Sequence, residues 1–412
     1  MKKNIYLLAT LLLASCIDYD DVSREVSVQV QLQMPAEFTQ GSDYEGHEIV
    51  LTQGSTKLIA TTNAEGIATF HGLIPNVYDI SCSWEISSDD YITLTGEQAV
   101  SNGCTVSGSI NEQLVSEAQE QSPVVLPLNV AVKRDIVIGK IAASGSKDAN
   151  NRNYLAGKYI ELYNQANDSV DVSGLYIALL ESSSPQPYTL DNLHEDYADS
   201  VVIVKQVFQI PADQPCLVAP GGTVLLTNSA TDHSDVNAFE YDLTDADFES
   251  KDQTGAMMNN PATPALITSF TIFARNATMN LMQGGPCGVI IFRTTEDIAS
   301  WPHTYGYGKT SGSLYYLCVP KRVILDGVDY LKNRTTGIDI SSKRLYADID
   351  AGYTHIEAVS GYTGEVVYRR TASVAPDGHK ILMDTNNSLN DFKLSTTIGP
   401  RQYDEAEDQN DN

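Results

Sequence analysis

The chain has 412 residues, of which 42% are hydrophobic, and its 26 Lys and Arg against 53 Asp and Glu give a formal net charge of −27. At about 100–200 residues per domain, this length predicts two or three domains, and the hydrophobic content excludes a wholly disordered chain. So acidic a chain is repelled by phosphates, which argues against nucleic acid as a partner and, for the same reason, against acidic substrates.

The first residues have the parts of a secretory signal. Two lysines precede a short apolar run over 5–13, which ends in the sequence Leu-Ala-Ser-Cys at Cys16. The run is too short for a permanent membrane-spanning helix. The Leu-Ala-Ser-Cys sequence resembles the lipobox of bacterial lipoproteins, which implies cleavage after residue 15 and a lipid on Cys16. We therefore expect a signal peptide over 1–15 and a lipidated linker over 16–24; the alternative is a plain signal peptide with an incidental cysteine.

An acidic stretch, Ile17-Asp-Tyr-Asp-Asp21, follows the predicted lipidation site at once. It resembles the surface-export signal of Bacteroidetes-type lipoproteins, and this resemblance implies an outer-membrane protein that faces the cell surface. The alternative is an ordinary solvated linker, which would leave the anchor in the other leaflet. No later segment has about 18 uninterrupted apolar residues, so the lipid is the expected membrane anchor.

The six cysteines leave the disulfide pairing open, and of Cys216, Cys287 and Cys318 at most two can pair together. Once Cys16 is assigned to lipid, an odd number remains, so at least one thiol is expected to stay unpaired as a small buried hydrophobe. Export permits disulfides, and Cys82 and Cys104 fall in the same predicted module and could pair. No Cys/His spacing is typical of a zinc site.

Residues 25–132 are predicted to form a small all-β module. Valines and a leucine alternate with polar residues over 26–32, which is typical of a half-buried strand. The segment 61–84 contains the sequence T-N-A-E-G-I-A-T-F-H-G-L-I-P-N-V-Y, which resembles the consecutive strands and turns of prealbumin-like, carboxypeptidase-regulatory β-sandwiches. That resemblance implies a spacer or docking module. Asn76 stands where those domains usually have glycine, so we expect this turn to differ in detail.

Residues 133–396 are predicted to form a second, larger β-domain. The segment 158–179 begins K-Y-I-E-L-Y-N and continues through V-D-V-S-G, and residues 384–392 read D-T-N-N-S-L-N-D-F. Both resemble the lamin-tail domain, an immunoglobulin-like β-sandwich, in its opening and closing motifs. Its excess length is expected in two long insertions, over 181–203 and 229–283.

The chain is therefore predicted to be all-β, with a prealbumin-like sandwich followed by an expanded lamin-tail-like, Ig-like sandwich. Residues 397–412 are polar and acidic and predict a disordered tail. As a whole the chain resembles an uncharacterised family of surface lipoproteins from gut anaerobes. That resemblance implies a setting beside outer-membrane uptake receptors.

Two stretches are candidates for ligand contact. The carboxylates of the acidic insertion 231–253 could form a calcium-like oxygen cage, but EF-hand spacing is absent, so a solvated loop is the default and metal binding stays open. Tyrosine combined with glycine is typical of adaptable binding surfaces, although tyrosine is also common in strands. The candidate contact residues for a glycan or other nutrient are Trp301, His303, Tyr305, Tyr307, Tyr315 and Tyr316.

No enzyme motif is recognisable, and the seven histidines are scattered along the chain. We therefore expect no enzyme activity and no cofactor, with a hydrolase of unrecognised site ranked last. The predicted function is that of an outer-membrane surface lipoprotein, an accessory binding component of a TonB-dependent nutrient uptake system. The alternative is a structural or adhesive surface protein without a small-molecule ligand.

Overall fold

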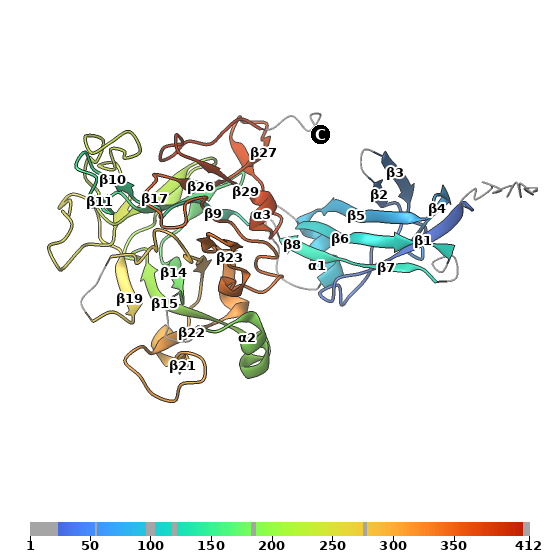
Figure 1. Cartoon of the computed structure of the whole chain (residues 1–412), viewed down its shortest axis with the longest axis horizontal. Coiled ribbons are helices and arrows are strands. Elements are labelled where there is room, and N and C mark those ends of the chain that lie inside the picture. Colours follow the sequence, from blue (N-terminus) through green and yellow to red (C-terminus); the bar gives the residue numbers. More distant parts are fainter. Residues whose placement is uncertain are drawn as a thin grey trace, which may run out of the picture. The chain divides into compact units, whose positions relative to one another are not determined.

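The structure, a computed structural model, describes residues 24–53, 56–95, 104–117, 122–132, 134–182, 187–274 and 278–406. The predicted signal and Cys16 lie outside these residues. The chain divides into two compact units, Met1–Trp84 with Val106–Val130 and Glu85–Thr105 with Ala131–Asn412. Strands dominate both units, as Figure 1 shows, which confirms the predicted all-β fold. None of the described helices is long and apolar enough to cross a membrane.

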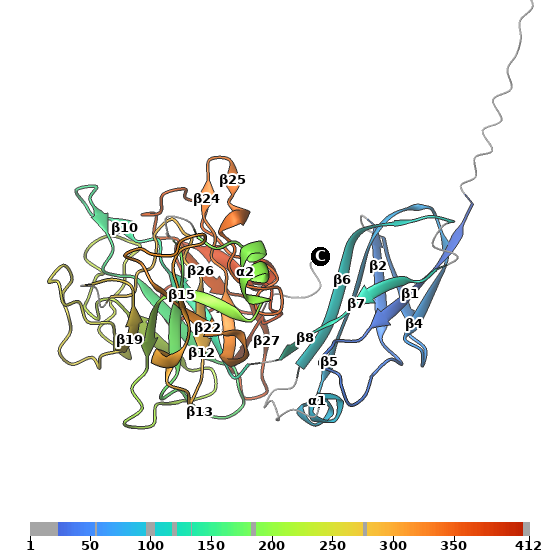
Figure 2. The same cartoon turned by 90° about the horizontal axis from the view of Figure 1, so that it is seen from below.

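The first unit is a sandwich of a three-stranded sheet, β4-β1-β7, and a five-stranded sheet, β3-β2-β5-β6-β8 (Figure 2). The predicted alternation of β1 is confirmed, because Val26, Val28, Val30 and Leu32 are buried between polar neighbours. Along this part of the chain the elements are β1 (Val26–Gln33), β2 (Glu48–Gln53), β3 (Thr56–Thr61), β4 (Ile67–Leu73), β5 (Asn76–Ile86), α1 (Ser88–Thr95), β6 (Cys104–Val115), β7 (Val124–Pro127) and β8 (Asn129–Val132).

The turn that joins β3 to β4 is built by two residues of the predicted motif. The side-chain oxygen of Asn63 accepts hydrogen bonds from the backbone N–H groups of Glu65 and Ile67 at 3.1 and 2.9 Å. Gly66 has a φ of +75°, and a Cβ there would lie 2.5 Å from the ring of Tyr44. Glycine is therefore required both by the backbone and by the close approach of that ring.

The predicted Cys82–Cys104 disulfide is not formed. The two cysteines lie on the neighbouring strands β5 and β6 and are 4% and 0% exposed, but neither is disulfide-bonded. Burial raises the pKa of the Cys82 thiol to about 11. Cys82 thus acts as a small apolar side chain of the core.

The second unit has two large sheets, one of six strands, β18-β17-β12-β9-β26-β29, and one of seven, β21-β22-β15-β14-β20-β23 with β19 added to β15. The strands of the first are β9 (Ile136–Ala142), β12 (Tyr159–Asn164), β17 (Thr223–Thr227), β18 (Phe248–Glu249), β26 (Val366–Arg369) and β29 (Phe392–Ser395). Those of the second are β14 (Tyr176–Leu180), β15 (Val201–Gln209), β19 (Ile267–Thr271), β20 (Val289–Phe292), β21 (His303–Thr304), β22 (Tyr316–Pro320) and β23 (Ile324–Val328).

Short pairs and single turns complete this unit. The two-stranded pairs are β10 (Ser146–Lys147) with β11 (Asn153–Tyr154), β13 (Val170–Asp171) with β16 (Leu217–Val218), β24 (Asn333–Arg334) with β25 (Gly337–Ile338), and β27 (Thr371–Val374) with β28 (Lys380–Leu382). The helices are α2 (Leu190–Tyr197), η2 (Ile298–Ser300), η3 (Lys321–Val323), η4 (Ile340–Ser342) and α3 (Ser388–Asp391).

Both large sheets are covered on two faces. The main core joins them, with Ile138 and Ile160 from the six-stranded sheet packed with Phe208 from the other. The outer side of the six-stranded sheet is covered by the described part of insertion 229–283, since Tyr159 packs with Leu243. β9 and β12 are consequently buried at every residue, as strands are when both faces of a sheet are covered.

The segment 397–406 is not disordered, so the predicted tail was wrong for this part. The Lys140 ammonium, which is fully buried, donates hydrogen bonds to the carbonyls of Gly399 and Gln402 at 2.6 and 2.9 Å. The ring of Tyr403 meets the ring of Tyr163 at 5.0 Å. Buried partners on β9 and β12 therefore hold a segment whose composition alone predicts disorder.

Candidate functional site

The predicted contact surface divides into core and surface residues. Trp301 and Tyr316 are 6% and 1% exposed and belong to the core around β15, β20 and β22, so neither can offer its ring to a ligand in solution. The Trp301 indole donates a hydrogen bond to Glu296 at 2.7 Å. Tyr307 packs edge-on against buried Tyr188, with ring centroids 5.4 Å apart.

The other three predicted residues form a surface cluster that also includes Phe270 of β19. Neighbouring ring centroids lie 5.4 Å apart from Phe270 to His303, 5.1 Å from His303 to Tyr315 and 4.7 Å from Tyr315 to Tyr305. The His303 and Tyr315 rings are stacked, with 17° between their planes. We call Phe270, His303, Tyr305 and Tyr315 the aromatic ladder.

The ladder lies beside an edge of β15 along which two different strands pair with successive parts of β15. Residues 201–204 pair with β22, and 206–209 pair with β19, so β19 and the β21–β22 pair share that edge (Figure 1). Phe270 comes from β19, whereas His303 comes from β21. The rings therefore bring an insertion together with the predicted aromatic stretch. Phe270 could not be found by motif, because its insertion carries no aromatic pattern that points to this edge.

The hydrogen bonds of the ladder leave polar atoms available. His303 Nδ1 lies 2.9 Å from the carbonyl of Trp301; since a carbonyl only accepts, Nδ1 carries the proton and donates. Nε2 is then a lone-pair acceptor when the ring is neutral. Among the described residues, Nε2 and the hydroxyls of Tyr305 and Tyr315 have no hydrogen-bond partner.

The acidic insertion is not a freely solvated loop. Asp232, Asp242 and Asp252 each accept a hydrogen bond from the backbone N–H two residues ahead and so stabilise local turns. The Arg401 guanidinium contacts both Asp245 and Asp247 at 3.0 Å. Within the described residues no group of three or more His, Cys, Asp or Glu side chains could hold a metal. The carboxylates of Asp232, Asp242, Asp245, Asp247 and Asp252 thus bind the chain itself.

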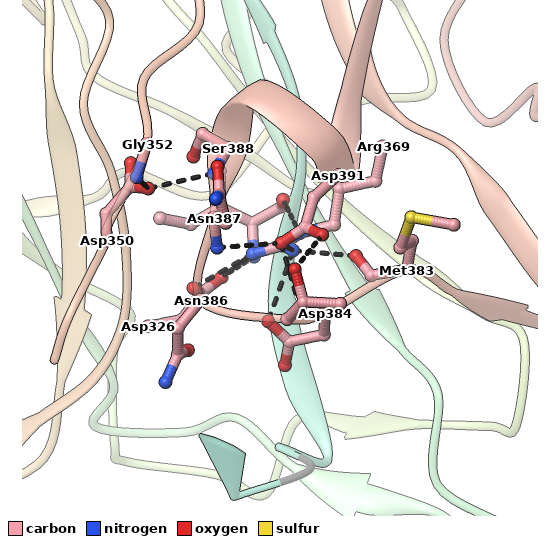
Figure 3. Close-up of polar contacts among 12 residues, drawn as sticks. Asp326, Asp350, Gly352, Arg369, Met383, Asp384, Asn386, Asn387, Ser388 and Asp391 are labelled. Carbon is pink, nitrogen blue, oxygen red and sulfur yellow. Dashed lines mark hydrogen bonds and ion pairs between the residues drawn. The ribbon is translucent and has the colours of Figure 1, made fainter. Parts of the chain in front are cut away.

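The closing motif over 384–392 surrounds a buried arginine (Figure 3). The Arg369 guanidinium donates to Asp326 at 2.9 and 3.0 Å, to Asp384 at 3.2 Å and to Asp391 at 3.3 Å. It also donates to the carbonyl of Ile138 on β9 at 2.9 Å. We call Arg369 with Asp326, Asp384 and Asp391 the Arg369 cluster. It connects β9, β23, β26 and α3.

The Arg369 cluster has more carboxylates than cations, and its electrostatics reflect this. Burial raises the pKa of Asp384 to about 7 against the lowering effect of Arg369, and burial also raises the pKa of Asp391. Asp384 Oδ2 is buried and has no hydrogen-bond partner. The cluster is enclosed, with all four side chains at most 4% exposed, so it has no surface to offer a substrate.

Tyr154 and His233 come closest to a nucleophile–base pair. The His233 Nε2–H donates to the carbonyl of Ser229 at 2.9 Å, so Nδ1 accepts the Tyr154 hydroxyl at 2.7 Å. Burial raises the pKa of Tyr154, and nearby Glu240 adds to this. A phenol held in its protonated form is a poor nucleophile. The pair satisfies the buried imidazole and does not indicate catalysis.

Comparisons with known proteins show which family and which solved structure the chain resembles. The sequence model of the family described as "Protein of unknown function (DUF4876)" matches residues 219–398, which include the Arg369 cluster and the whole aromatic ladder. The matched residues all lie in the second unit. The crystal structure of a DUF4876 family protein from Bacteroides thetaiotaomicron is similar, with a TM-score of 0.53 and 18% identity, over 89% of this chain and 94% of that chain. This likeness concerns the fold alone. No curated protein matches the chain.

Proposed function

We propose that the protein is a non-enzymatic lipoprotein of the outer-membrane surface that serves as an accessory binding component of a TonB-dependent nutrient uptake system. The aromatic ladder supports the binding role, because it is a preformed surface with polar atoms available to a ligand. The lipobox at Cys16 and the acidic stretch after it support the anchor and the outward orientation.

The two units suit different parts of this role. The first unit, with its resemblance to prealbumin-like sandwiches, would act as a stalk or docking module beside the membrane. The second, with its resemblance to the lamin-tail domain, would carry the ligand surface. The enclosed Arg369 cluster and the protonated Tyr154 favour binding over catalysis.

The anchor is tested by replacing the predicted lipidated cysteine. Cys16→Ala should release the protein from the membrane fraction, measured by fractionation and by incorporation of labelled lipid. Cys216→Ala is the matched control, since that thiol is not disulfide-bonded and is only partly buried. A Cys16→Ala protein that stays in the membrane would contradict the lipoprotein assignment.

The uptake role is tested by purifying the intact lipoprotein from outer membranes solubilised in mild detergent. Recovery of a TonB-dependent receptor with it supports the accessory role. Recovery of the protein alone, under conditions that preserve known lipoprotein–receptor pairs, would overturn that role and favour a structural or adhesive surface protein.

A further inference from the structure

We propose that the aromatic ladder binds neutral saccharides, an inference that rests on the proposed binding function and names its ligand class. The surface is accessible to a ligand, because Tyr315, which lies between the His303 and Tyr305 rings, is 46% exposed. A sugar ring has apolar C–H groups on its faces and hydroxyls around its rim. Aromatic rings bear partial negative charge on their faces and attract such C–H groups.

The ladder is held in place before any ligand arrives. The His303 ring is tied to the carbonyl of Trp301, whose own side chain is fixed in the core by Glu296. Tyr315 stacks on that fixed ring, and the next residue, Tyr316, is buried. The exposed Tyr315 ring is therefore positioned both by the stacked His303 ring and by its buried neighbour in the chain. Such preorganisation lowers the entropy lost when a ligand binds.

The available polar atoms favour a hydroxylated ligand. The hydroxyls of Tyr305 and Tyr315 can each donate and accept a hydrogen bond, and neutral His303 can accept one at Nε2. Sugar hydroxyls both donate and accept, so they can satisfy all three groups. A purely apolar ligand would leave all three groups without a partner, and a simple cation could use their lone pairs but would give the two hydroxyl hydrogens no acceptor.

The charge of the protein favours neutral over acidic saccharides as ligands. None of the four ladder residues carries a fixed charge, and the chain as a whole has a formal net charge of −27. A polyanionic saccharide would approach against this field and would find no arginine or lysine among the ladder rings. We therefore expect the ladder to prefer neutral saccharides.

The test uses the full chain in detergent with immobilised probes. The neutral probes are maltohexaose, cellohexaose, xylohexaose and galactomannan, and the acidic probe is polygalacturonate. At least one neutral probe should bind, and Tyr315→Ala should weaken that binding about tenfold, the effect of losing ~1.4 kcal/mol. Tyr315→Phe keeps the ring without the hydroxyl, so its affinity for the probe should lie between those of the wild-type protein and Tyr315→Ala.

Phe239→Ala is the matched control, because Phe239 is similarly exposed, at 42%, but lies outside the ladder. It should leave binding unchanged. The proposal is overturned if no neutral probe binds, if polygalacturonate binds better than all neutral probes, or if Tyr315→Ala has no more effect than the control. If any of these results is obtained but a receptor still co-purifies with the protein, the proposed uptake role is retained and only the proposal of a saccharide ligand is rejected.

Discussion

The aromatic ladder and the Arg369 cluster lie in the same unit, yet one meets solvent and the other is sealed inside. The cluster includes Asp384 and Asp391 of the closing motif, one of the two motifs that resemble the lamin-tail domain, and its side chains are at most 4% exposed. The ladder has no family motif, but its central ring is 46% exposed. The comparison teaches that the most recognisable residues of this chain stabilise the fold, while the surface that we propose for binding comes from residues without a recognised motif.

The largest effect is expected from removing the arginine. Arg369→Met would leave three buried carboxylates without their cation and should lower the free energy of unfolding by about 3–5 kcal/mol. Chemical denaturation measures this loss. Arg322→Met is the control, because the Arg322–Glu296 pair is 60% and 44% exposed, and its denaturation midpoint should not move. Equal effects of the two substitutions would contradict a structural role for the cluster.

The adjacent tyrosines give the next contrast. Tyr316→Ala empties a core site that is 1% exposed and should cost about 3 kcal/mol of stability. Tyr315→Ala, one residue earlier, should change stability by no more than ~0.5 kcal/mol, because surface substitutions seldom do more. Thermal unfolding of both variants tests the division between core and ladder. A large loss for Tyr315→Ala would mean that the ladder is part of the core.

The pH dependence should be smaller and should point to Asp384. Its pKa in the folded protein is about 7, above the ordinary value of 3.8, so the native state holds a proton that the unfolded state has lost. Stability from this group is therefore present at low pH and falls as the pH rises from 4 to 7, by about 1–2 kcal/mol between pH 5 and 7.

Asp384→Asn isolates this contribution, because the amide resembles the protonated carboxyl at every pH. Relative to the variant, the wild-type protein should lose stability as the pH rises through that window, as measured by denaturation at several pH values. The charge of Asp391 adds to the raised pKa of Asp384, so the difference between the two proteins reports the titration of this pair of carboxylates. A constant difference between the two proteins across the window would show that Asp384 does not titrate there.

The smallest effect is expected from reductant. Since none of the described cysteines is disulfide-bonded, dithiothreitol should leave the unfolding temperature unchanged. Loss of a native disulfide typically costs about 2–5 kcal/mol, so a bond between Cys82 and Cys104 would be evident as a marked drop. A reductant-dependent decrease would restore the pairing that the sequence suggested.

Local patterns predicted the fold class and several strand faces. The alternation of β1 is confirmed. In β12 the same period of two places Ile160 in the main core and Tyr159 under an insertion. These features follow from a period of two along a single strand, which the sequence displays directly. Three of the four ladder rings were predicted and Phe270 was not, and the other three predicted residues, Trp301, Tyr307 and Tyr316, lie in the core or pack against it.

Arg369 was missed although it left a signal. It ends an apolar strand, Val366–Arg369, that precedes a segment rich in aspartate, and a charge in such a strand needs a buried partner. Its partners come from β9 and β23 as well as from the closing motif, so no local window contains them. The prediction of disorder over 397–406 was wrong for the same reason. This segment is ordered by contacts with distant side chains such as Lys140 and Tyr163.

The sequence by itself determined what depends on neighbours along the chain: the β-strands and their inward and outward faces, and the turn at Asn63–Gly66. Only the tertiary structure decided which aromatic rings face solvent, which carboxylates share Arg369 and whether the cysteines are joined. The physical reason is that burial and pairing are properties of contacts between residues far apart in the chain. Such contacts arise only when the sheets pack.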